Sequence, residues 1–394
     1  MNILKLFADY PFIPSFLDSG KEITDIVYDS RKARPDTIFV AMRGANRDGH
    51  DSCMNAYENG CRDFVVEHRV TLPNDAITYL VADSRRALSV MSRSLFQFTP
   101  KEEKKLVPTQ LIAVTGTKGK TSTCMILRSI LEAAGRKVGY IGTLGVMYDG
   151  KVLETPNTTP ESYEIFRHLR QMRLSGCEYV LIEASSQGVK LHRTADLCFN
   201  LGVFTNLSPD HIGPGEHESF EEYLACKREL FSQCALSIGN IDDEYYDQVV
   251  SNRFGRLTFG LSEKADYRAE DTAFTVSADG FSTVFTCREK GKRHELKLKL
   301  PGMFSVYNAL GAIAVARNYG VSYETIQAGL SAVRVKGRTE IVPDTGDVRV
   351  LLDYAHNELS VKSLFDMLLL YKPKRLIAVF GCGGNRSKLR RYAM

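Results

Sequence analysis

The sequence lacks the features that mark several classes of protein. No apolar run approaches the roughly 18 residues needed for a membrane-spanning helix. The nine cysteines are scattered without CxxC spacing, which argues against a zinc cluster or a disulfide framework. A formal net charge of +4 is too small to indicate nucleic acid or an anionic membrane as a partner. With no repeat or low-complexity tract, the composition predicts a globular protein of the reducing cytosol.

The length of 394 residues predicts several domains, because one hydrophobic core rarely grows beyond roughly 250–300 residues. We predict an N-terminal domain over 1–105, a central domain over 106–336 and a third domain over 337–394. The first boundary lies in the charged, proline-flanked stretch 99–110, which reads as a linker. The second lies near Gly337.

Segments typical of strands and of helices alternate along the chain, which predicts an α/β fold with a parallel sheet in the central domain. The predicted strands are 25–30, 37–44, 63–67, 77–82, 111–115, 137–145, 177–186, 197–207, 235–242, 348–357 and 375–381. The predicted helices are 84–98, an amphipathic helix that follows a glycine-rich turn and stops at Gly135, 161–174, 219–233 and 358–371.

The strongest local signal is a glycine-rich turn between the strand 111–115 and the helix that follows it. Its residues are Gly116, Thr117, Lys118, Gly119, Lys120, Thr121 and Ser122. In this context backbone N–H groups and the helix N-terminus bind phosphate, the lysine reaches the terminal phosphates, and the hydroxyl of Thr121 can bind Mg²⁺. The strict pattern requires glycine where Val114 stands, so the loop is a shortened variant. The alternative is an ordinary strand–helix turn.

Three further residues are candidates for metal binding or acid–base chemistry. Glu183 ends an apolar strand, where a carboxylate points into the crevice that binds ligands in parallel sheets. His211 follows another predicted strand, and Lys227 lies on a predicted helix. Taken singly, each has a structural alternative. The glutamate could form a structural salt bridge, the histidine could be a surface residue or a hydrogen-bonded core residue, and the lysine could lie on a solvated helix face.

Taken together, the motifs resemble those of a known family. The stretches are TGTKGKTST, NTTP (157–160), EASSQGVKLHR (183–193), FTNLSPDHIG (204–213), PGMFSVYNALGAIA (301–314), KGRTE (336–340) and DYAHN (353–357). In this order they resemble the Mur ligase superfamily of ATP-dependent carboxylate–amine ligases, and most closely its MurE-type branch of UDP-N-acetylmuramoyl-tripeptide synthetases. The resemblance spans nearly the whole chain. It implies a small α/β N-terminal domain, a central phosphate-loop ATPase domain and a Rossmann-like third domain.

The resemblance also implies roles for individual residues. Lys120 and the loop Gly116–Thr121 would bind the ATP phosphates, while Thr121, Glu183 and His211 would bind Mg²⁺. Lys227 would carry CO₂ as a carbamate and become an anionic metal ligand. The residues implied around the adenosine are Asn308, Arg338, Asp353, His356 and Asn357.

On the substrate side, the residues implied to hold the UDP-muramoyl dipeptide are Ser30, Asn157, Thr158, Thr159, Ser185 and Arg193. Ser30 would contact the uridine. The chain departs from the family pattern at Gln187, Leu191 and Ser305. These departures concern the substrate pocket and leave the ATP loop unchanged.

The implied reaction adds an amino acid, meso-diaminopimelate or L-lysine, to the D-Glu carboxylate of UDP-MurNAc-L-Ala-D-Glu through an acyl phosphate. The residues that choose between these amino acids would lie past position 394. The resemblance further implies a monomer. Within the superfamily, the alternatives are a MurF-type or folylpolyglutamate-synthase-type ligase.

The third segment is shorter than a typical domain of roughly 100–150 residues. We therefore expect an incomplete third domain, in which the predicted strand 375–381 leaves apolar surface exposed. From Lys372 onward the chain carries basic residues and no acidic one, which we attribute to an unfinished strand–helix unit. A protein that binds nucleotide or UDP-sugar without completing the ligation is the non-enzymatic alternative.

Overall fold

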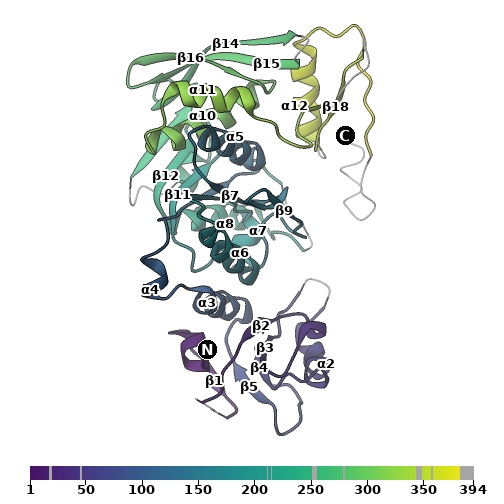
Figure 1. Cartoon of the computed structure of the whole chain (residues 1–394). Helices are drawn as coiled ribbons and strands as arrows, with labels where there is room; N and C mark the ends of the chain where they lie inside the picture. The colour runs from purple at the N-terminus through teal and green to yellow at the C-terminus, as the bar shows by residue number, and fades with distance from the viewer. Residues whose placement is uncertain are drawn as a thin grey trace. The chain divides into compact units, whose positions relative to one another are not determined.

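A computed structural model of the chain describes residues 1–16, 20–44, 47–210, 212–213, 215–250, 255–277, 280–342, 348–355 and 358–381 (Figure 1). The described chain forms two compact units, each built from segments distant in sequence. The first unit comprises 1–113, 139–200 and 209–235, and the second comprises 114–138, 201–208 and 236–394. Of the helices described, none has both the length and the apolar character needed to cross a membrane.

The N-terminal part of the first unit is a five-stranded sheet of order β1-β5-β4-β3-β2. Its strands are β1 (Ile13–Pro14), β2 (Asp25–Val27), β3 (Thr37–Val40), β4 (Asp63–Val66) and β5 (Ile77–Leu80). Strands β2 to β5 run parallel, and β1 pairs antiparallel with β5. The four strands predicted in this segment are confirmed, each shorter than its predicted range.

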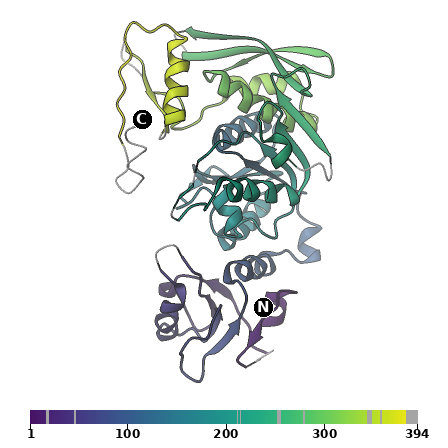
Figure 2. The ribbon, with the colours of Figure 1, turned by 180° about the vertical axis from the view of Figure 1, so that it is seen from behind.

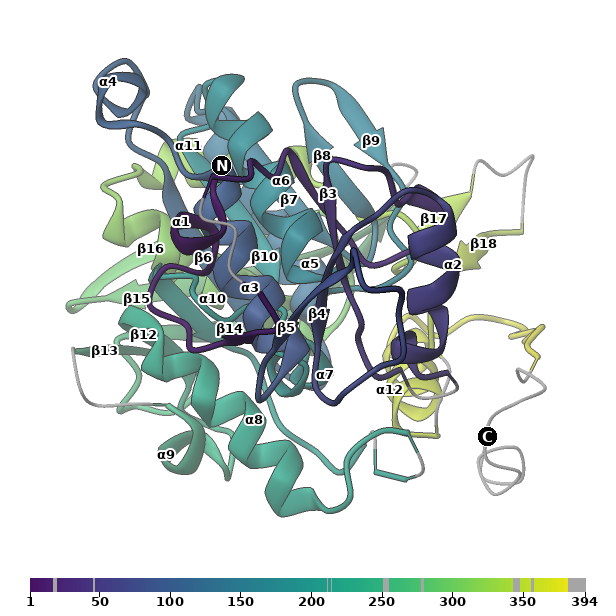
Figure 3. The same cartoon turned by 90° about the horizontal axis from the view of Figure 1, so that it is seen from below.

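Two apolar clusters cover the two faces of this sheet. Along β3, Ile38 and Val40 belong to one cluster and Phe39 to the other, because successive side chains of a strand point to opposite faces. Helices α1 (Ile3–Phe7) and α3 (Ser84–Phe96) contribute to the first cluster, and α2 (Cys53–Glu58) to the second (Figure 3). Strands buried on both faces read as short continuous apolar runs, which is why the sequence predicts them well.

The stretch predicted as a linker contains a short helix, α4 (Pro100–Glu103). Thr99 and Glu102 form a capping box at its start. Glu102 and Glu103 then pair with Arg170 and Arg173 at 2.9 and 2.6 Å. This stretch is therefore tied by ion pairs to the helix that carries those arginines, α6 (Ser162–Leu174).

The rest of the first unit contains strands β10, β7, β8 and β9, which are neighbours in that order. Their bounds are Tyr179–Glu183, Val138–Gly142, Gly145–Tyr148 and Lys151–Leu153. The pairs β7–β8 and β8–β9 are antiparallel, so the parallel arrangement predicted here does not extend to this edge. The β8–β9 turn is Asp149-Gly150, and both residues have positive φ, as the tightest hairpins require. Helices α7 (Ser186–Lys190) and α8 (Phe220–Ser232) complete this part.

Strands β16-β15-β14-β13-β12-β11-β6 are neighbours in that order, and each contributes residues to the second unit. The bounds are Lys292–Leu298, Gly280–Glu289, Tyr267–Ser277, Arg256–Gly260, Cys234–Asn240, Phe199–Phe204 and Gln110–Thr115. The pairs β12–β13 and β13–β14 are parallel, as predicted for the central sheet, whereas β14, β15 and β16 form the long antiparallel hairpins seen in Figure 2. The short helix α9 (Tyr246–Val249) precedes β13.

Helix α5 (Lys120–Ala133) follows the phosphate loop, and α10 (Met303–Asn318) and α11 (Tyr323–Ala332) pack against this helix. Helix α10 is buried almost all round, as its Ala- and Val-rich sequence predicts. Helix α11 approaches α5 closely at Gly329, where an added Cβ would lie 2.5 Å from the Cα of Ile130.

The C-terminal segment contains an antiparallel pair, β17 (Glu340–Val342) and β18 (Val350–Leu352), and helix α12 (Glu358–Leu369). The predicted strand 375–381 is wrong, because none of its residues belongs to a strand in the structure. Among the described residues no strand pairs with it, and an extended segment needs a hydrogen-bonded neighbour to be a β-strand. Ile377, Val379 and Phe380 are 69%, 97% and 60% exposed, so the expected apolar exposure is confirmed.

Candidate nucleotide and metal site

The phosphate-loop candidate leaves β6 at Thr115 and enters α5 at Lys120. Gly116 and Gly119 have φ of 148° and 87°, a region that favours glycine. A Cβ on Gly116 would overlap Thr205 and lie 3.0 and 3.1 Å from backbone atoms of Asn206. The glycines are therefore required by the backbone path and by close packing.

Hydrogen bonds from the segment that follows β11 stabilise the conformation of the phosphate loop. The backbone N–H groups of Thr117 and Lys118 donate to the carbonyl oxygen and the Oδ1 of Asn206 at 2.8 and 2.9 Å. The amide nitrogen of Asn206 donates back to the carbonyl of Lys118 at 3.1 Å. Thr205 donates to the same carbonyl at 2.6 Å. Asn206 was not among the residues predicted from the sequence, although it lies inside the motif 204–213.

The side chain of Lys120 lies over the loop. Its Nζ donates to the carbonyl oxygens of Gly116 and Thr117 at 2.8 and 3.3 Å. The ammonium group is thus held beside the backbone that would wrap a phosphate. Thr121, in the first turn of α5, is buried.

Asn308 of α10 packs against the same loop. Its Oδ1 accepts a hydrogen bond from the hydroxyl of Thr123 at 3.3 Å, and a Cβ on Gly119 would overlap that oxygen. The structure therefore brings Asn308, predicted to bind the nucleoside, to the start of α5. Its role in binding stays a prediction.

Two other predicted nucleoside residues lie in the C-terminal segment. Asp353, just after β18, accepts hydrogen bonds from the backbone N–H groups of Thr339 and Ala355 at 2.8 Å each. The guanidinium of Arg338 stacks 4.5 Å from the ring centre of Tyr354. The predicted residues His356 and Asn357 lie outside the described residues.

In the first unit, Glu183 is a fully buried carboxylate at the end of β10. Its Oε1 accepts hydrogen bonds from the hydroxyl of Tyr140 and from the backbone N–H of Thr143, the latter at 3.2 Å. Its Oε2 accepts from the hydroxyl of Thr143 at 3.1 Å. Buried charge is tolerated when it is hydrogen-bonded in this way. Neither Tyr140 nor Thr143 was found from the sequence.

The substrate-side threonines and serine gather around the same strand end. The hydroxyl of Thr159 donates to the backbone carbonyl of Glu183 at 2.7 Å, and its oxygen lies 3.0 Å from the Oγ of Ser185. Thr158 Oγ1 lies 3.0 Å from the hydroxyl oxygen of Thr143. For Asn157, the structure shows its backbone carbonyl accepting from Thr155 at 3.1 Å. The NTTP and EASS motifs, distant in sequence, therefore form one polar cluster.

Arg193 is held beside this cluster by Glu161. Its Nε and one terminal nitrogen contact Glu161 Oε1 at 3.1 and 2.9 Å, and its other terminal nitrogen donates to the carbonyl of Thr159 at 3.1 Å. Arg85 of α3 contacts the same carboxylate at 3.0 Å. Two guanidinium groups thus share the Glu161 carboxylate, so these three side chains together carry one net positive charge.

Lys227 of α8 is 1% exposed, which excludes the solvated helix face considered as its alternative. Its Nζ lies 4.5 Å from the ring centre of Tyr223. His211 lies outside the described residues. A neighbouring histidine, His217, is fully buried, and its Nε2 lies 2.9 Å from the hydroxyl oxygen of Ser186.

The segment that carries Ser30 lines a cavity. The cavity has a volume of about 380 Å³, and Asp29, Arg31, Tyr28 and Tyr163 are among its lining residues. Ser30 begins a single turn of 3₁₀ helix, and its carbonyl oxygen accepts from the side chain of Asn59 at 2.9 Å. Burial raises the pKa of Tyr28 far above its usual range, so its hydroxyl stays protonated at neutral pH.

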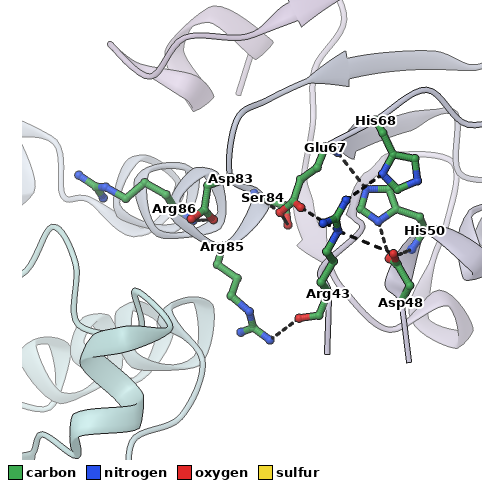
Figure 4. A network of polar contacts seen from close by, with 9 residues as sticks. All are labelled: Arg43, Asp48, His50, Glu67, His68, Asp83, Ser84, Arg85 and Arg86. Carbon is green, nitrogen blue, oxygen red and sulfur yellow. Dashed lines mark hydrogen bonds and ion pairs between the residues drawn. The ribbon is translucent and has the colours of Figure 1, made fainter. Parts of the chain in front are cut away.

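A polar network joins Arg43, Asp48 and His50 to the start of α3 (Figure 4). Asp48, His50 and His68 have ligand atoms within 4.8 Å of one another. The His50 Nε2 accepts from the backbone N–H of Glu67 at 2.9 Å, so its Nδ1 carries the proton and donates to Asp48 at 2.5 Å. Both ring nitrogens of His50 are therefore hydrogen-bonded. The Nε of Arg43 lies 3.2 Å from Oε2 of Glu67. These contacts indicate a structural network, since a cation here would have to displace them.

The oxygen-rich cluster around Glu183 suits Mg²⁺ better. Mg²⁺ prefers carboxylate and phosphate oxygens and keeps several waters. A buried carboxylate fixed by three donors is the kind of ligand this ion takes. The donor chemistry of Glu183 therefore fits the cation that the sequence predicted there.

Comparisons with known proteins agree with this geometry. The Mur ligase middle domain matches residues 114–316, and the Mur ligase glutamate ligase domain matches residues 337–394. The UDP-N-acetylmuramoyl-L-alanyl-D-glutamate–2,6-diaminopimelate ligase 1 of Clostridium acetobutylicum is 36% identical over all of this chain and 80% of its own length. The corresponding ligase of Caldanaerobacter subterraneus subsp. tengcongensis is 37% identical over 95% of this chain and 75% of its own length.

Solved structures show the same fold. A UDP-N-acetylmuramoyl-L-alanyl-D-glutamate–2,6-diaminopimelate ligase superposes with a TM-score of 0.76 at 24% identity, covering all of this chain and 79% of the other. The MurF ligase of Thermotoga maritima, solved with ADP, gives a TM-score of 0.61 at 20% identity over 89% of this chain and 75% of the other. The α/β fold class predicted from the sequence is thereby confirmed. The chain belongs to the Mur ligase family of ATP-dependent ligases.

Proposed function

We propose that the chain catalyses the ATP-dependent addition of 2,6-diaminopimelate to the D-Glu carboxylate of UDP-MurNAc-L-Ala-D-Glu. The observation that carries the proposal is the phosphate loop, which is locked by Asn206 at the start of α5. The substrate pair follows from the relatives, since those at 36 and 37% identity bear the name of this ligase. The names also favour diaminopimelate over the L-lysine left open by the sequence.

The loop supplies the positive potential for a triphosphate. Backbone N–H groups at the start of α5 and the dipole of this 14-residue helix favour negative charge. Lys120 would exchange its loop carbonyls for the terminal phosphates. Fixed donors of this kind act without reorganisation as charge moves in the transition state.

The cation site would use Thr121, Glu183, His211 and the carbamate of Lys227. A bound Mg²⁺ neutralises the phosphate oxygens and orients them for in-line attack. The burial of Lys227 supports the carbamate, because CO₂ would convert an amine held away from bulk water into an anionic oxygen ligand. Labelling with ¹³C-bicarbonate should give a carbamate NMR signal that is absent in Lys227→Arg; an identical spectrum for both proteins would remove this part of the proposal.

The muramoyl peptide would lie along the cluster of Thr158, Thr159, Ser185 and Arg193. Because Glu161 and the carbonyl of Thr159 already fix the guanidinium of Arg193, little side-chain entropy is lost when an anionic substrate group binds it. The cavity beside Ser30 would take the uridine.

The reaction then has two balanced steps. A carboxylate oxygen of the substrate attacks the γ-phosphorus of ATP, the bond to the β-phosphate oxygen breaks, and ADP leaves with an acyl phosphate formed. The amine of the incoming amino acid attacks the acyl carbon, phosphate departs, and the amine nitrogen loses a proton. The residues of this chain bind and orient the two anions, so their repulsion no longer opposes the first step.

Calorimetric titration tests the two binding sites separately. We expect ADP with Mg²⁺ to bind the wild type and to bind Lys120→Ala at least about tenfold more weakly, a loss of about 1.4 kcal/mol. We expect UDP-MurNAc-L-Ala-D-Glu to bind the wild type and to lose affinity in Arg193→Ala. Failure of both ligands to bind a folded wild type would refute the proposal.

We further propose the three domains 1–105, 106–336 and 337–394. The two family matches, which begin at 114 and 337, support these boundaries. Limited proteolysis should cut first near residues 105 and 337; first cuts elsewhere would contradict them.

A further inference from the structure

We propose that Tyr140 is a positioning residue of the metal site, whose hydroxyl fixes the Glu183 carboxylate in its cation-binding orientation. The inference rests on the proposed function, because it takes Glu183 as a ligand of the nucleotide-bound cation. No motif in the sequence pointed to Tyr140, which reads there as one more apolar residue of a buried strand.

The two side chains come from adjacent strands. Tyr140 lies in β7 and Glu183 ends β10, its neighbour in the sheet. Both side chains are fully buried. The hydroxyl of Tyr140 donates to Glu183 Oε1, and the backbone N–H of Thr143 donates to the same oxygen at 3.2 Å.

The direction of the tyrosine hydrogen bond is fixed by its second partner. The backbone N–H of Leu144 donates to the tyrosine oxygen at 3.3 Å. An ionised carboxylate accepts hydrogen bonds and cannot donate them. The hydroxyl hydrogen must therefore point at Glu183, and the ring and the following turn together hold Oε1 in place.

The other carboxylate oxygen is held differently. Oε2 receives the hydroxyl of Thr143 at 3.1 Å, and that hydroxyl oxygen also lies 3.0 Å from Thr158 Oγ1. A rotatable hydroxyl with two neighbours can turn away from Oε2 as a cation approaches. Oε1 is therefore the oxygen that the tyrosine and the turn after it anchor.

The backbone leaves room for this pair at Gly142. A Cβ there would overlap the Tyr140 hydroxyl and lie 2.5 Å from Glu183 Oε1. Glycine at 142 is therefore part of the same arrangement. Partners that orient a metal ligand commonly change metal affinity by about 10–100-fold when they are removed.

The experiment measures Mn²⁺ binding by electron paramagnetic resonance in the presence of ADP, using the full chain. We expect Tyr140→Phe to weaken Mn²⁺ binding by about tenfold while leaving the thermal midpoint close to that of the matched control. The control is Tyr79→Phe, which removes another fully buried tyrosine hydroxyl that donates to a carboxylate, Asp63 Oδ1 at 2.9 Å, in the N-terminal sheet. Tyr79→Phe should leave Mn²⁺ affinity unchanged.

A double-mutant cycle separates positioning from general damage. In a Glu183→Gln background, which removes the charged ligand, adding Tyr140→Phe should cause no further loss of Mn²⁺ affinity. Wild-type affinity in Tyr140→Phe, or equal losses in both backgrounds, would overturn the inference and leave the proposed function standing. Unchanged Mn²⁺ affinity in Glu183→Gln alone would instead show that Glu183 is not a ligand, which overturns both the inference and the proposed metal site.

Discussion

Gly119→Ala and Gly135→Ala form a matched pair at the two ends of helix α5. Gly119 precedes the helix with φ of 87°, and Gly135 follows it with φ of 73°. A Cβ at Gly135 would meet nothing within 4 Å, whereas one at Gly119 would overlap Oδ1 of Asn308. The two substitutions share a backbone penalty and differ in one side-chain contact.

The shared penalty can be estimated from the backbone alone. An L-residue in the left-handed region costs roughly 1–2 kcal/mol, and the stiffer unfolded chain of alanine offsets about 0.4–1 kcal/mol of this. Each variant should therefore lose about 1 kcal/mol of unfolding free energy. The Asn308 side chain can rotate away from the new methyl group. Gly119→Ala should therefore weaken nucleotide binding rather than lower the unfolding free energy further.

Urea unfolding and ADP titration on both variants provide the assay. We expect similar losses of stability, and at least about a tenfold weaker ADP affinity in Gly119→Ala alone, equivalent to about 1.4 kcal/mol. Equal ADP affinity in the two variants would refute the placement of Asn308 at the nucleotide. A loss of several kcal/mol of stability in Gly119→Ala alone would refute the view that Asn308 can move aside.

The remaining predictions concern Lys120, the ion pair between Arg193 and Glu161, and Asp83. Lys120→Met should abolish ATP-dependent phosphate release while leaving the unfolding midpoint within a few degrees of wild type in a thermal melt. Glu161→Gln should weaken UDP-MurNAc-L-Ala-D-Glu binding several-fold in calorimetry, because Arg193 loses its anchor, and should leave ADP binding unchanged. The hydrogen bond to His192 lowers the pKa of Asp83 to about 2, below its unfolded value of roughly 3.9. Urea midpoints of wild type and Asp83→Asn should therefore differ above pH 4 and converge as the pH falls toward 2, whereas a constant gap would contradict the assigned cause.

The sequence predicted the central elements well for a physical reason. Buried parallel strands are short apolar runs, and α6 and α8 lie within one residue or so of their predicted ranges at both ends. The phosphate loop was predictable because only glycine tolerates the φ of Gly116 beside Asn206. The sheet edges were missed, although Asp149-Gly150 is a recognisable two-residue hairpin turn.

The site could be predicted only in part from the sequence. Motifs identified Glu183 and Arg193, yet their partners Tyr140, Thr143 and Glu161 come from other elements and depend on how the chain folds. The prediction of a strand at 375–381 was wrong because local sequence propensity does not show whether a neighbouring strand is present to pair with it. The burial of Lys227 could not be predicted from the sequence either, because charged residues surround it along its helix.

The most direct test is phosphate release by the wild-type chain with ATP, Mg²⁺, UDP-MurNAc-L-Ala-D-Glu and meso-diaminopimelate, followed by mass spectrometry of the product. We predict phosphate release that requires all three substrates, together with the UDP-muramoyl tripeptide as product. Binding of ADP and the UDP-muramoyl dipeptide without any tripeptide would contradict the ligase assignment and favour a binding protein.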